Sequence, residues 1–283
     1  RDIATIFEMD DDLFAVPRHN PSNGFWGLKK VRQVLHNTLE AVDAVIVSTQ
    51  PLKERLLALG YTPAKIHVCH NHIHPKVWEH AAQSKVQTNN KDRPVIGWQG
   101  SNTHDVDFRE ALPALSRIVK DRPEVMLRFF GSVPLTVRGV IPDTHFQWAP
   151  GVEFDRYPAA LRFMHFDIGL APITDSKFNQ SKSNLKWLEY STLGVPTVAS
   201  AVYPYARSIS NGATGFVADS VEGWYTALTT LLDDPGLRQR IGEAARFEVE
   251  QRWAPAQHIA CWERALQAAI GIRRGAHALV SKL

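Results

Sequence analysis

Short runs of apolar and β-branched residues alternate along this chain with segments in which apolar residues recur every three or four positions. In the first part, residues 3–9, 44–47 and 65–69 form such runs, which are typical of buried strands. Helical spacing between them predicts an amphipathic helix over about 27–42, carried by Val31, Val34, Leu35, Leu39 and Val42. A second helix is predicted over 51–60, because a proline opens that segment and a glycine closes it.

The same alternation continues to the end of the chain. Apolar runs predict further strands at 95–98, 125–130, 146–148, 167–171, 196–201 and 215–218. Helical spacing predicts helices over about 108–119, 154–164, 185–193, 221–232, 237–253 and 256–270. Strands that alternate with helices imply parallel sheets covered on both faces. We therefore expect an α/β fold made of doubly wound, Rossmann-like units.

The length and one polar stretch predict two domains. A chain of 283 residues corresponds to about two domains at ~150 residues each. Residues 83–93 contain few apolar side chains and are typical of a linker. We expect a first domain over 1–82, a second over 94–252 and a closing segment over 253–283.

Composition narrows the class of protein. Hydrophobic residues make up 44% of the chain, which is enough for full cores and excludes wholesale disorder or a coiled coil. No apolar run approaches the ~20 residues that a bilayer-spanning helix needs. The formal net charge of +3 suits an acidic small molecule or an anionic surface, and is too weak to indicate nucleic acid. Cys69 and Cys261 make no disulfide framework, and we expect reduced thiols in a cytoplasmic protein.

Ligands of doubly wound sheets bind beyond the carboxyl ends of the strands, which here precede the loops 99–104, 130–134, 148–153, 172–184 and 200–214. The first candidate in these loops is the small, polar run Gly100, Ser101, Asn102, Thr103 and His104. Small residues let a phosphate approach the backbone, and we expect the next helix to direct its N-terminus there. The run matches neither a dinucleotide fingerprint nor a P-loop, so an ordinary strand-to-helix turn is the alternative.

The second candidate comes immediately before a predicted helix. Lys182, Ser183 and Asn184 place an ammonium, a hydroxyl and an amide at that helix start, which would suit a diphosphate. The alternative is a capped helix with a solvated lysine. Glu189 lies within the same helix among apolar residues, where a carboxylate needs partners if it is buried. The two hydroxyls of a bound ribose would be suitable partners for a buried Glu189. The alternative is that Glu189 is an ordinary surface glutamate.

Two clusters suggest metal ligands, and we weigh both against simpler interpretations. The triplet at 10–12 is acidic, although a turn with Asx capping explains it equally well. His70, His72 and His74 alternate, so on a strand they would share a face. No cysteine or further ligand completes a zinc set there. We therefore expect no metal and no other cofactor.

The run KSNLKWLEYSTLGVPTVAS at 182–200 resembles the donor-site helix and following strand of retaining glycosyltransferases of family 4, which have the GT-B fold. Other stretches agree with this family in order. FEMDDDLF at 7–14 resembles the "DDDLF" turn of one bacterial branch. DAVIVST at 43–49, VCHNHI at 68–73, IGWQGS at 96–101 and NGATGFV at 211–217 also fit. Together these stretches span nearly the whole chain.

The resemblance implies two Rossmann-like domains, of which the second binds a nucleotide-sugar and the first binds most of a glycan, lipid or protein acceptor. It implies transfer with retention and without a metal. Lys182 and Glu189 are the catalytic residues expected from the family pattern, Glu189 at the donor ribose and Lys182 at the diphosphate. The remaining expected donor contacts are Gly100, Ser101, Asn102, His104, Gly131, Trp148, Ser183, Asn184 and Leu185. The last helix, around Trp262, would pack back on the first domain.

This chain departs from the family pattern in three respects. Ser181 stands where the family often has the first glutamate of a Glu-x7-Glu pattern. His104 is the nearest match to a basic residue that commonly follows the first loop of the second domain. The first domain is about half the usual length, so we expect either a reduced domain or a fragment of a longer polypeptide.

The first hypothesis is therefore a retaining glycosyltransferase. A non-catalytic nucleotide-sugar-binding or scaffold module is the second, and a glycosyltransferase acting on modified DNA bases is the third. We expect a cytoplasmic location, with the inner face of the membrane as a candidate surface partner and further domains of a longer polypeptide as others.

Overall fold

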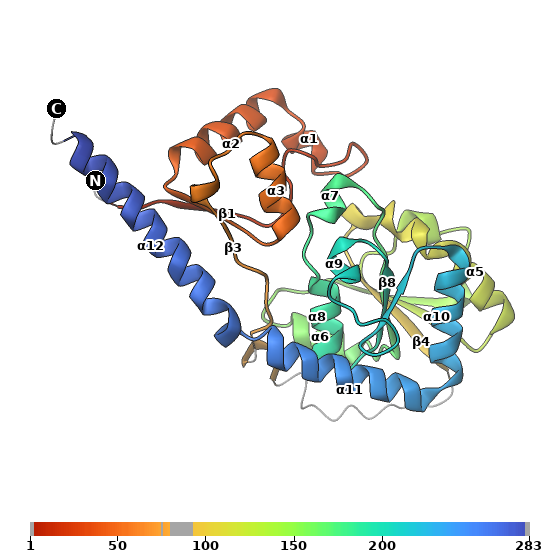
Figure 1. The fold of residues 1–283 in the computed structure, drawn as a ribbon. Coiled ribbons are helices and arrows are strands. Elements are labelled where there is room, and N and C mark those ends of the chain that lie inside the picture. The colour runs from red at the N-terminus through yellow and green to blue at the C-terminus, as the bar shows by residue number, and fades with distance from the viewer. Residues whose placement is uncertain (1–2, 75, 80–92, 281–283) are drawn as a thin grey trace. The chain divides into compact units, whose positions relative to one another are not determined.

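The computed structural model describes residues 3–74, 76–79 and 93–280. It divides into two compact units (Figure 1). Unit 1 comprises Arg1–His72, Ser176–Ser183 and Pro255–Leu283, and unit 2 comprises Ile73–Asp175 and Asn184–Ala254. Three segments fall differently from the expected domain ranges: residues 73–79 and 253–254 group with unit 2, and residues 176–183 group with unit 1. Of the expected linker 83–93, all but Arg93 lies outside the described residues.

Unit 1 is built on a three-stranded parallel sheet of order β1-β2-β3. Its strands are β1 (Ile6–Met9), β2 (Ala44–Val47) and β3 (Ile66–Val68). The helices are α1 (Asn23–Trp26), α2 (Lys29–Ala41), α3 (Gln50–Ala58), α7 (Lys177–Gln180) and α12 (Pro255–Val280). Buried leucines of α2 and α3 pack with Met9, Val45 and Val47 in one core. A second cluster joins Ile46 and Cys69 to Ala265 of α12, so helices contribute to both clusters of this sheet.

Unit 2 contains a six-stranded parallel sheet of order β6-β5-β4-β7-β8-β9. The strands are β4 (Val95–Gly100), β5 (Met126–Gly131), β6 (Phe146–Pro150), β7 (Ile168–Ala171), β8 (Thr197–Ser200) and β9 (Phe216–Ala218). The helices are α5 (Leu112–Asp121), α6 (Tyr157–Phe163), α8 (Leu185–Thr192), α9 (Tyr203–Ala206), α10 (Val221–Asp233) and α11 (Pro235–Arg252). The strand order reverses direction between β4 and β7, which is the switch point where ligands bind in such sheets.

Two apolar cores cover the two faces of this sheet. Residues of α5 and α10 pack in one core with Trp98 and Phe129. Residues of α6 and α8 pack in the other with Met126 and Phe130. This placement follows the pleat, because Phe129 and Phe130 are consecutive and point to opposite faces. The expected α/β fold with Rossmann-like parallel sheets is confirmed.

Several expected boundaries and placements were wrong. Strand β1 begins at Ile6 rather than residue 3, and the helix expected over 27–42 begins at Lys29, after a separate turn of helix. The last helix continues to Val280. The histidines at 70, 72 and 74 follow β3 in irregular backbone, so they do not share the face of a strand. No helix within the described ranges is long and apolar enough to cross a bilayer.

Candidate functional site

The ends of β4 and β5 in unit 2 approach each other at two glycines. The Ser132 amide donates to the Gly100 carbonyl over 2.9 Å, immediately beyond the strand ends. Gly131 has a φ of +101°, and a Cβ on it would lie 2.4 Å from the Gly100 carbonyl oxygen. Only glycine fits this backbone without displacement. The backbones of β4 and β5 therefore lie in close contact at the carboxyl edge, where both glycines are half-buried.

Trp148 lies at the same edge, on β6. Its indole Nε1 donates to the Gly131 carbonyl over 3.0 Å, and its side chain is 54% exposed. An indole that is anchored by one hydrogen bond and otherwise exposed presents an aromatic surface to the solvent. The Trp148 indole is thus anchored to the backbone of Gly131.

Glu189 of α8 accepts two hydrogen bonds at the same carboxylate oxygen, Oε2. Gln99 Nε2 donates from the end of β4 over 2.8 Å, and the Tyr157 hydroxyl donates from the start of α6 over 2.9 Å. Burial raises the pKa of Glu189 to about 7, against the opposing effects of the Lys186 charge and the Tyr157 hydrogen bond. Tyr157 is itself positioned by stacking on Phe130, with ring centroids 5.7 Å apart. A carboxyl group on the border of ionisation at neutral pH therefore lies at the carboxyl edge of the sheet.

Tyr190, the next residue on α8, fixes this helix against the sheet. Its hydroxyl accepts a hydrogen bond from the backbone amide of Gln99 over 3.1 Å and donates one to the backbone carbonyl of Leu170 over 3.3 Å. Its ring occupies the space above Gly169, where a Cβ would lie 2.5 Å from it. Sequence reasoning missed Gln99, Tyr157 and Tyr190. The available signal for Gln99 was a polar residue at the end of the otherwise apolar strand VIGWQG.

The start of α8 differs from the capped helix that was the alternative interpretation of residues 182–184. Asn184 is buried at the N-cap position, but its side chain donates to Ser208 Oγ over 2.9 Å. The Asn184 side chain therefore makes no capping hydrogen bond to this helix. Leu185, at the first helical position, is half-buried. A helix N-terminus that its N-cap side chain does not cap can direct backbone amides at an anion.

The loop after β4 does not lead directly into a helix, which corrects the expectation that a helix N-terminus faces residues 100–104. Two short 3₁₀ turns, Asn102–His104 and Asp107–Glu110, intervene before α5. Ser101 and Asn102 are exposed, and Ser101 Oγ lies 2.7 Å from Thr103 Oγ1. This loop can offer hydroxyl and amide groups to a ligand, but no aligned helix.

His104 is oriented by a buried carboxylate. Its Nδ1 lies 2.9 Å from Asp107 Oδ2, while Asp107 Oδ1 accepts from both the amide and the hydroxyl of Thr174 over 2.9 Å. Burial alone would raise the pKa of Asp107, but the hydrogen bonds from His104 and Thr174 outweigh it and lower that pKa. Asp107 therefore joins the loop after β4 to the loop after β7.

Lys182 and Ser183 belong to unit 1 and have partners there. Lys182 Nζ lies 3.1 and 3.2 Å from the two carboxylate oxygens of Asp11 and 4.5 Å from the centre of the Phe178 ring. Ser183 Oγ accepts from Asn71 Nδ2 over 2.9 Å. The structure thus places Lys182 in an ion pair, where the sequence analysis expected a diphosphate-binding ammonium or a solvated side chain.

Each member of the acidic triplet at 10–12 has its own partner. Asp10 Oδ1 accepts from Asn71 Nδ2 over 2.8 Å, and Asp11 pairs with Lys182. Asp12 is fully buried and pairs with Arg55 over 3.0 Å. Among the described residues no group of histidine, cysteine, aspartate and glutamate is arranged to hold a metal.

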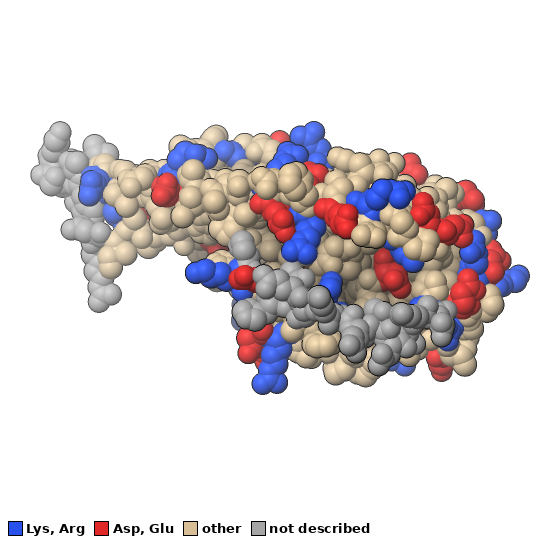
Figure 2. All heavy atoms as spheres, turned by 90° about the horizontal axis from the view of Figure 1, so that it is seen from below, with Lys and Arg blue, Asp and Glu red and all other residues tan. Residues whose placement is uncertain are grey.

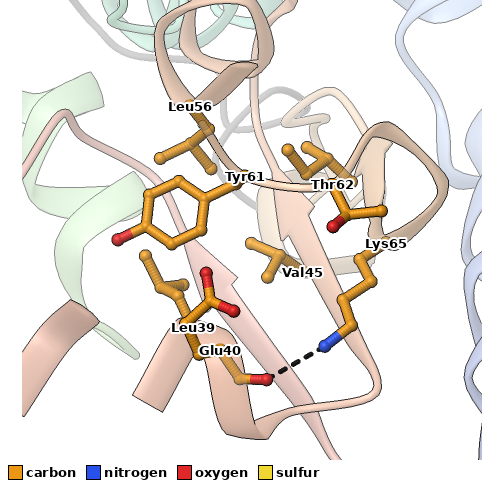
Figure 3. A pocket seen from close by; sticks show the side chains of 8 residues that line it. Leu39, Glu40, Val45, Leu56, Tyr61, Thr62 and Lys65 are labelled. Atoms are coloured by element: carbon orange, nitrogen blue, oxygen red, sulfur yellow. Dashed lines mark hydrogen bonds between the residues drawn. The ribbon is translucent and has the colours of Figure 1, made fainter. Parts of the chain in front are cut away.

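Two of the cavities lined by described residues lie away from the Glu189 cluster. One, of about 10 Å³, is lined by Tyr61 and Lys65 among others in unit 1 (Figure 3), where Lys65 Nζ donates to the Glu40 carbonyl. Its volume corresponds to about one water molecule, so it is too small for a nucleotide. The other, of about 160 Å³, lies in unit 2 between the end of α6 and the end of α8, with Arg162 and Asp167 in its lining. The Glu189 cluster lines neither cavity.

Residues 185–247, from the start of α8 into α11, match the family model described as "Glycosyl transferases group 1". No curated protein sequence matches the chain.

Solved structures of low sequence identity share the fold. One is TarM from S. aureus, crystallised with UDP, fondaparinux and α-GlcNAc-glycerol, which is 14% identical in sequence with a TM-score of 0.65. The match covers 93% of this chain and 50% of the TarM chain. HepE from Anabaena, in complex with UDP and glucose, is 14% identical with a TM-score of 0.65. The match covers 99% of this chain and 72% of the HepE chain. WaaG, a glycosyltransferase of lipopolysaccharide biosynthesis, is 14% identical with a TM-score of 0.67. The match covers 94% of this chain and 75% of the WaaG chain.

These similarities establish the GT-B type of fold. This chain spans about half the length of the TarM chains that it matches. The segment with the family match is the one that carries Glu189 and the uncapped start of α8.

Proposed function

We propose that this protein is a glycosyltransferase that moves a sugar from a nucleotide-sugar donor to a glycan, lipid or protein acceptor. The observation that carries the proposal is the Glu189 cluster at the carboxyl edge of the unit 2 sheet, within the segment that matches group 1 glycosyltransferases. A carboxylate one turn into a helix whose N-cap side chain makes no cap would supply both kinds of recognition that a nucleotide diphosphate requires.

Glu189 would accept hydrogen bonds from the two ribose hydroxyls of the donor. The amides at Asn184 and Leu185 would bind its diphosphate through the N-terminus of α8. Trp148 would stack on the base, since its ring is exposed and anchored at Gly131. Lys182 precedes α8 by three residues and would exchange its exposed carboxylate partner for the diphosphate.

Catalysis in this proposal is the stabilisation of the departing diphosphate. Backbone amides of the α8 start, together with the Lys182 ammonium once it has left Asp11, would stabilise negative charge as it develops on the leaving group. Positioning of the acceptor supplies the rest. Retention of configuration, membership of family 4 with the DDDLF turn, independence from metals and a cytoplasmic or inner-membrane location belong to the proposal through the sequence resemblance. Because two structural neighbours contain UDP, UDP-sugars are the first donors to test.

Calorimetry with UDP and UDP-glucose, followed by a donor-hydrolysis assay, tests the proposal. Glu189→Gln is expected to weaken UDP binding about tenfold or more, because hydrogen bonds to charged groups contribute about 1.5–3 kcal/mol each. Glu243→Gln, an exposed substitution within the same matched segment, serves as the control and should leave binding unchanged. Equal affinities of the two variants would contradict the assignment of Glu189 to the donor.

A non-catalytic nucleotide-sugar-binding module is the second candidate. The observation that favours it is Ser181, which replaces the first glutamate of the family pattern and whose hydroxyl donates to the Lys177 carbonyl. Under this alternative, UDP binds and remains sensitive to Glu189→Gln, but no donor is consumed with or without an acceptor. Turnover of the donor therefore decides between the two.

A further inference from the structure

The cavity of about 160 Å³ lies at the amino edge of the unit 2 sheet. Asp167 and Val195 line it and come just before β7 and β8, whereas Glu189 and the start of α8 belong to the carboxyl edge. The cavity is therefore separate from the proposed donor site. A cavity of about 150 Å³ with apolar walls can hold a benzene molecule. The room is thus sufficient for a small ring or a branched chain.

Most of the cavity wall is apolar. Leu161 comes from α6 and Tyr190 from α8, two helices that pack side by side in one core (Figure 1). Phe166, Leu193 and Val195 complete the wall from the loops that enter β7 and β8. The Tyr190 ring is held by both hydrogen bonds of its hydroxyl, so this part of the wall is preformed. Such walls favour a ligand with a compact apolar body.

Two basic side chains line the cavity at the end of α6. Arg162 Nη1 donates to the Leu193 carbonyl over 3.0 Å, which ties the end of α6 to the end of α8. His165 follows with a φ of +50°, the only positive φ of a non-glycine residue in the described ranges. Its ring makes no hydrogen bond and no ion pair with any residue that the structure describes. Two groups that carry N–H donors thus meet at one apolar cavity.

The electrostatic balance at the cavity favours an anion. Burial lowers the pKa of Arg162, and the charge of Arg246 lowers it further. Burial also lowers the pKa of His165, as do the charges of Arg128 and Arg162, while Asp167 acts in the opposite direction. The charged forms of both lining bases are therefore disfavoured, and a bound anion would stabilise them.

The acidic group in the lining is already engaged. Asp167 Oδ2 accepts the Val95 amide over 2.8 Å, and the Asp167 charge also acts on Arg128, whose pKa it raises against the larger effect of burial. Arg246 has its own acidic partner, because its Nε lies 2.8 Å from Glu250 Oε1. On the face drawn in Figure 2, basic and acidic side chains are likewise interspersed. The bases that remain to bind an external anion are those at the end of α6.

We propose that this cavity binds a small organic monocarboxylate with an apolar body of about six carbon atoms. The ligand carboxylate would accept hydrogen bonds from the Arg162 guanidinium, whose planar fork matches a carboxylate, and from the His165 ring. The apolar body would pack against Phe166, Leu193 and Val195. The proposal concerns the edge of the sheet opposite the donor site and does not depend on the proposed transferase activity.

NMR titration of the full chain with benzoate tests it, with benzamide and benzylamine as neutral and cationic analogues of similar size. Benzoate is expected to saturate with a Kd of about 1 mM or lower. The two analogues should bind at least about tenfold more weakly, because neither carries a negative charge. Backbone amide signals of residues 161–167 and 193–195 should shift with benzoate. Shifts confined to residues 184–189 would place the anion at the start of α8 and overturn the proposal.

Arg162→Met and His165→Asn are each expected to weaken benzoate binding about tenfold. Asparagine tolerates the left-handed backbone of residue 165, and this variant keeps the contact between Arg162 and Leu193. Arg138→Met removes an exposed arginine of unit 2 and should retain the parent affinity. Glu189→Gln should also retain it.

Circular dichroism and urea unfolding establish that each variant is folded. No saturable binding of benzoate, equal affinity for the three ligands, a preference for benzylamine, or equal losses in the cavity and control variants would each overturn the proposal. Because UDP binding is measured separately, failure here leaves the proposed function standing.

Discussion

Replacement of Glu189 by glutamine is expected to make the unliganded protein more stable. Burial raises the pKa of this carboxyl from 4.5 to about 7, so ionisation is less favourable in the folded state than in the unfolded chain. At 1.36 kcal/mol per pKa unit, an ionised Glu189 lowers the free energy of unfolding by about 3 kcal/mol. The folded pKa is the higher one, so this penalty is absent below pH 4.5, grows between pH 4.5 and 7, and is complete above pH 7.

Glutamine keeps the local hydrogen bonds. Gln99 and Tyr157 both donate to the single oxygen Oε2, and an amide oxygen in that position accepts both. Glu189→Gln should therefore raise the free energy of unfolding by about 3 kcal/mol at pH 8 and leave it almost unchanged at pH 4.5. The same substitution should weaken UDP binding, a loss of function with a gain in stability that is expected of a strained binding residue.

Urea unfolding at pH 8 and pH 4.5, followed by tryptophan fluorescence, measures both effects. Glu243→Gln on α11 serves as the control, because its exposed carboxylate only accepts a hydrogen bond from Gln239. The control should change stability little at either pH. The reasoning fails if Glu189→Gln destabilises the protein at pH 8, or if its gain is the same at both pH values.

Three further substitutions or treatments test the fold around the two sheets. Gly131→Ala should lower the free energy of unfolding by about 2–3 kcal/mol, because the new Cβ would meet the Gly100 carbonyl. Gly212 also has a positive φ but has open space around it, so Gly212→Ala should lower it by only about 1 kcal/mol. Similar losses for the two variants in urea unfolding would refute the close-approach argument. Arg55→Met leaves the buried Asp12 carboxylate without its ion-pair partner and should lower the free energy of unfolding by about 2 kcal/mol. The loss should be much smaller in an Asp12→Asn background, where no carboxylate is left unpaired. Equal losses in the two backgrounds would exclude the ion pair as the cause. Burial raises the pKa of the Cys69 thiol to about 12. Mass spectrometry should therefore find Cys69 unmodified by iodoacetamide at pH 8 in the native protein and modified in urea. Rapid modification of Cys69 in the native protein would contradict its burial.

The sequence predicted those parts of the fold that local periodicity determines. The run of Val95 to Trp98 and the helical spacing of 221–232 reappear as β4 and α10. Exceptions arise where a local contact competes with periodicity. The helix expected from residue 27 starts two residues later, because the Gly27 amide donates back to the Asn23 carbonyl and closes a separate turn. Periodicity does not register such a turn.

The site was predictable only in part, because its decisive hydrogen bonds join residues distant in sequence. Glu189 and the glycines at 100 and 131 were recognisable from their positions after strands or on the helix. Gln99 and Tyr157 were not, since they lie 90 and 32 residues from Glu189 and no local pattern connects them. The resemblance to a family does not supply them either, because it names Glu189 without the two groups that donate hydrogen bonds to it.

The segment at 176–183 shows how a family pattern can be carried by different contacts. Thr49 Oγ1 donates to the Ser181 carbonyl over 2.7 Å, and Ser181 is buried, so its side chain has no room to become a long carboxylate. Lys182, next to it, pairs with Asp11 while both side chains remain partly exposed. Such a pair contributes about 0–1 kcal/mol, whereas charge-assisted hydrogen bonds to a phosphate are roughly twice as strong as neutral ones. Under the proposed function, an ion pair of this strength is weak enough to be exchanged for a diphosphate.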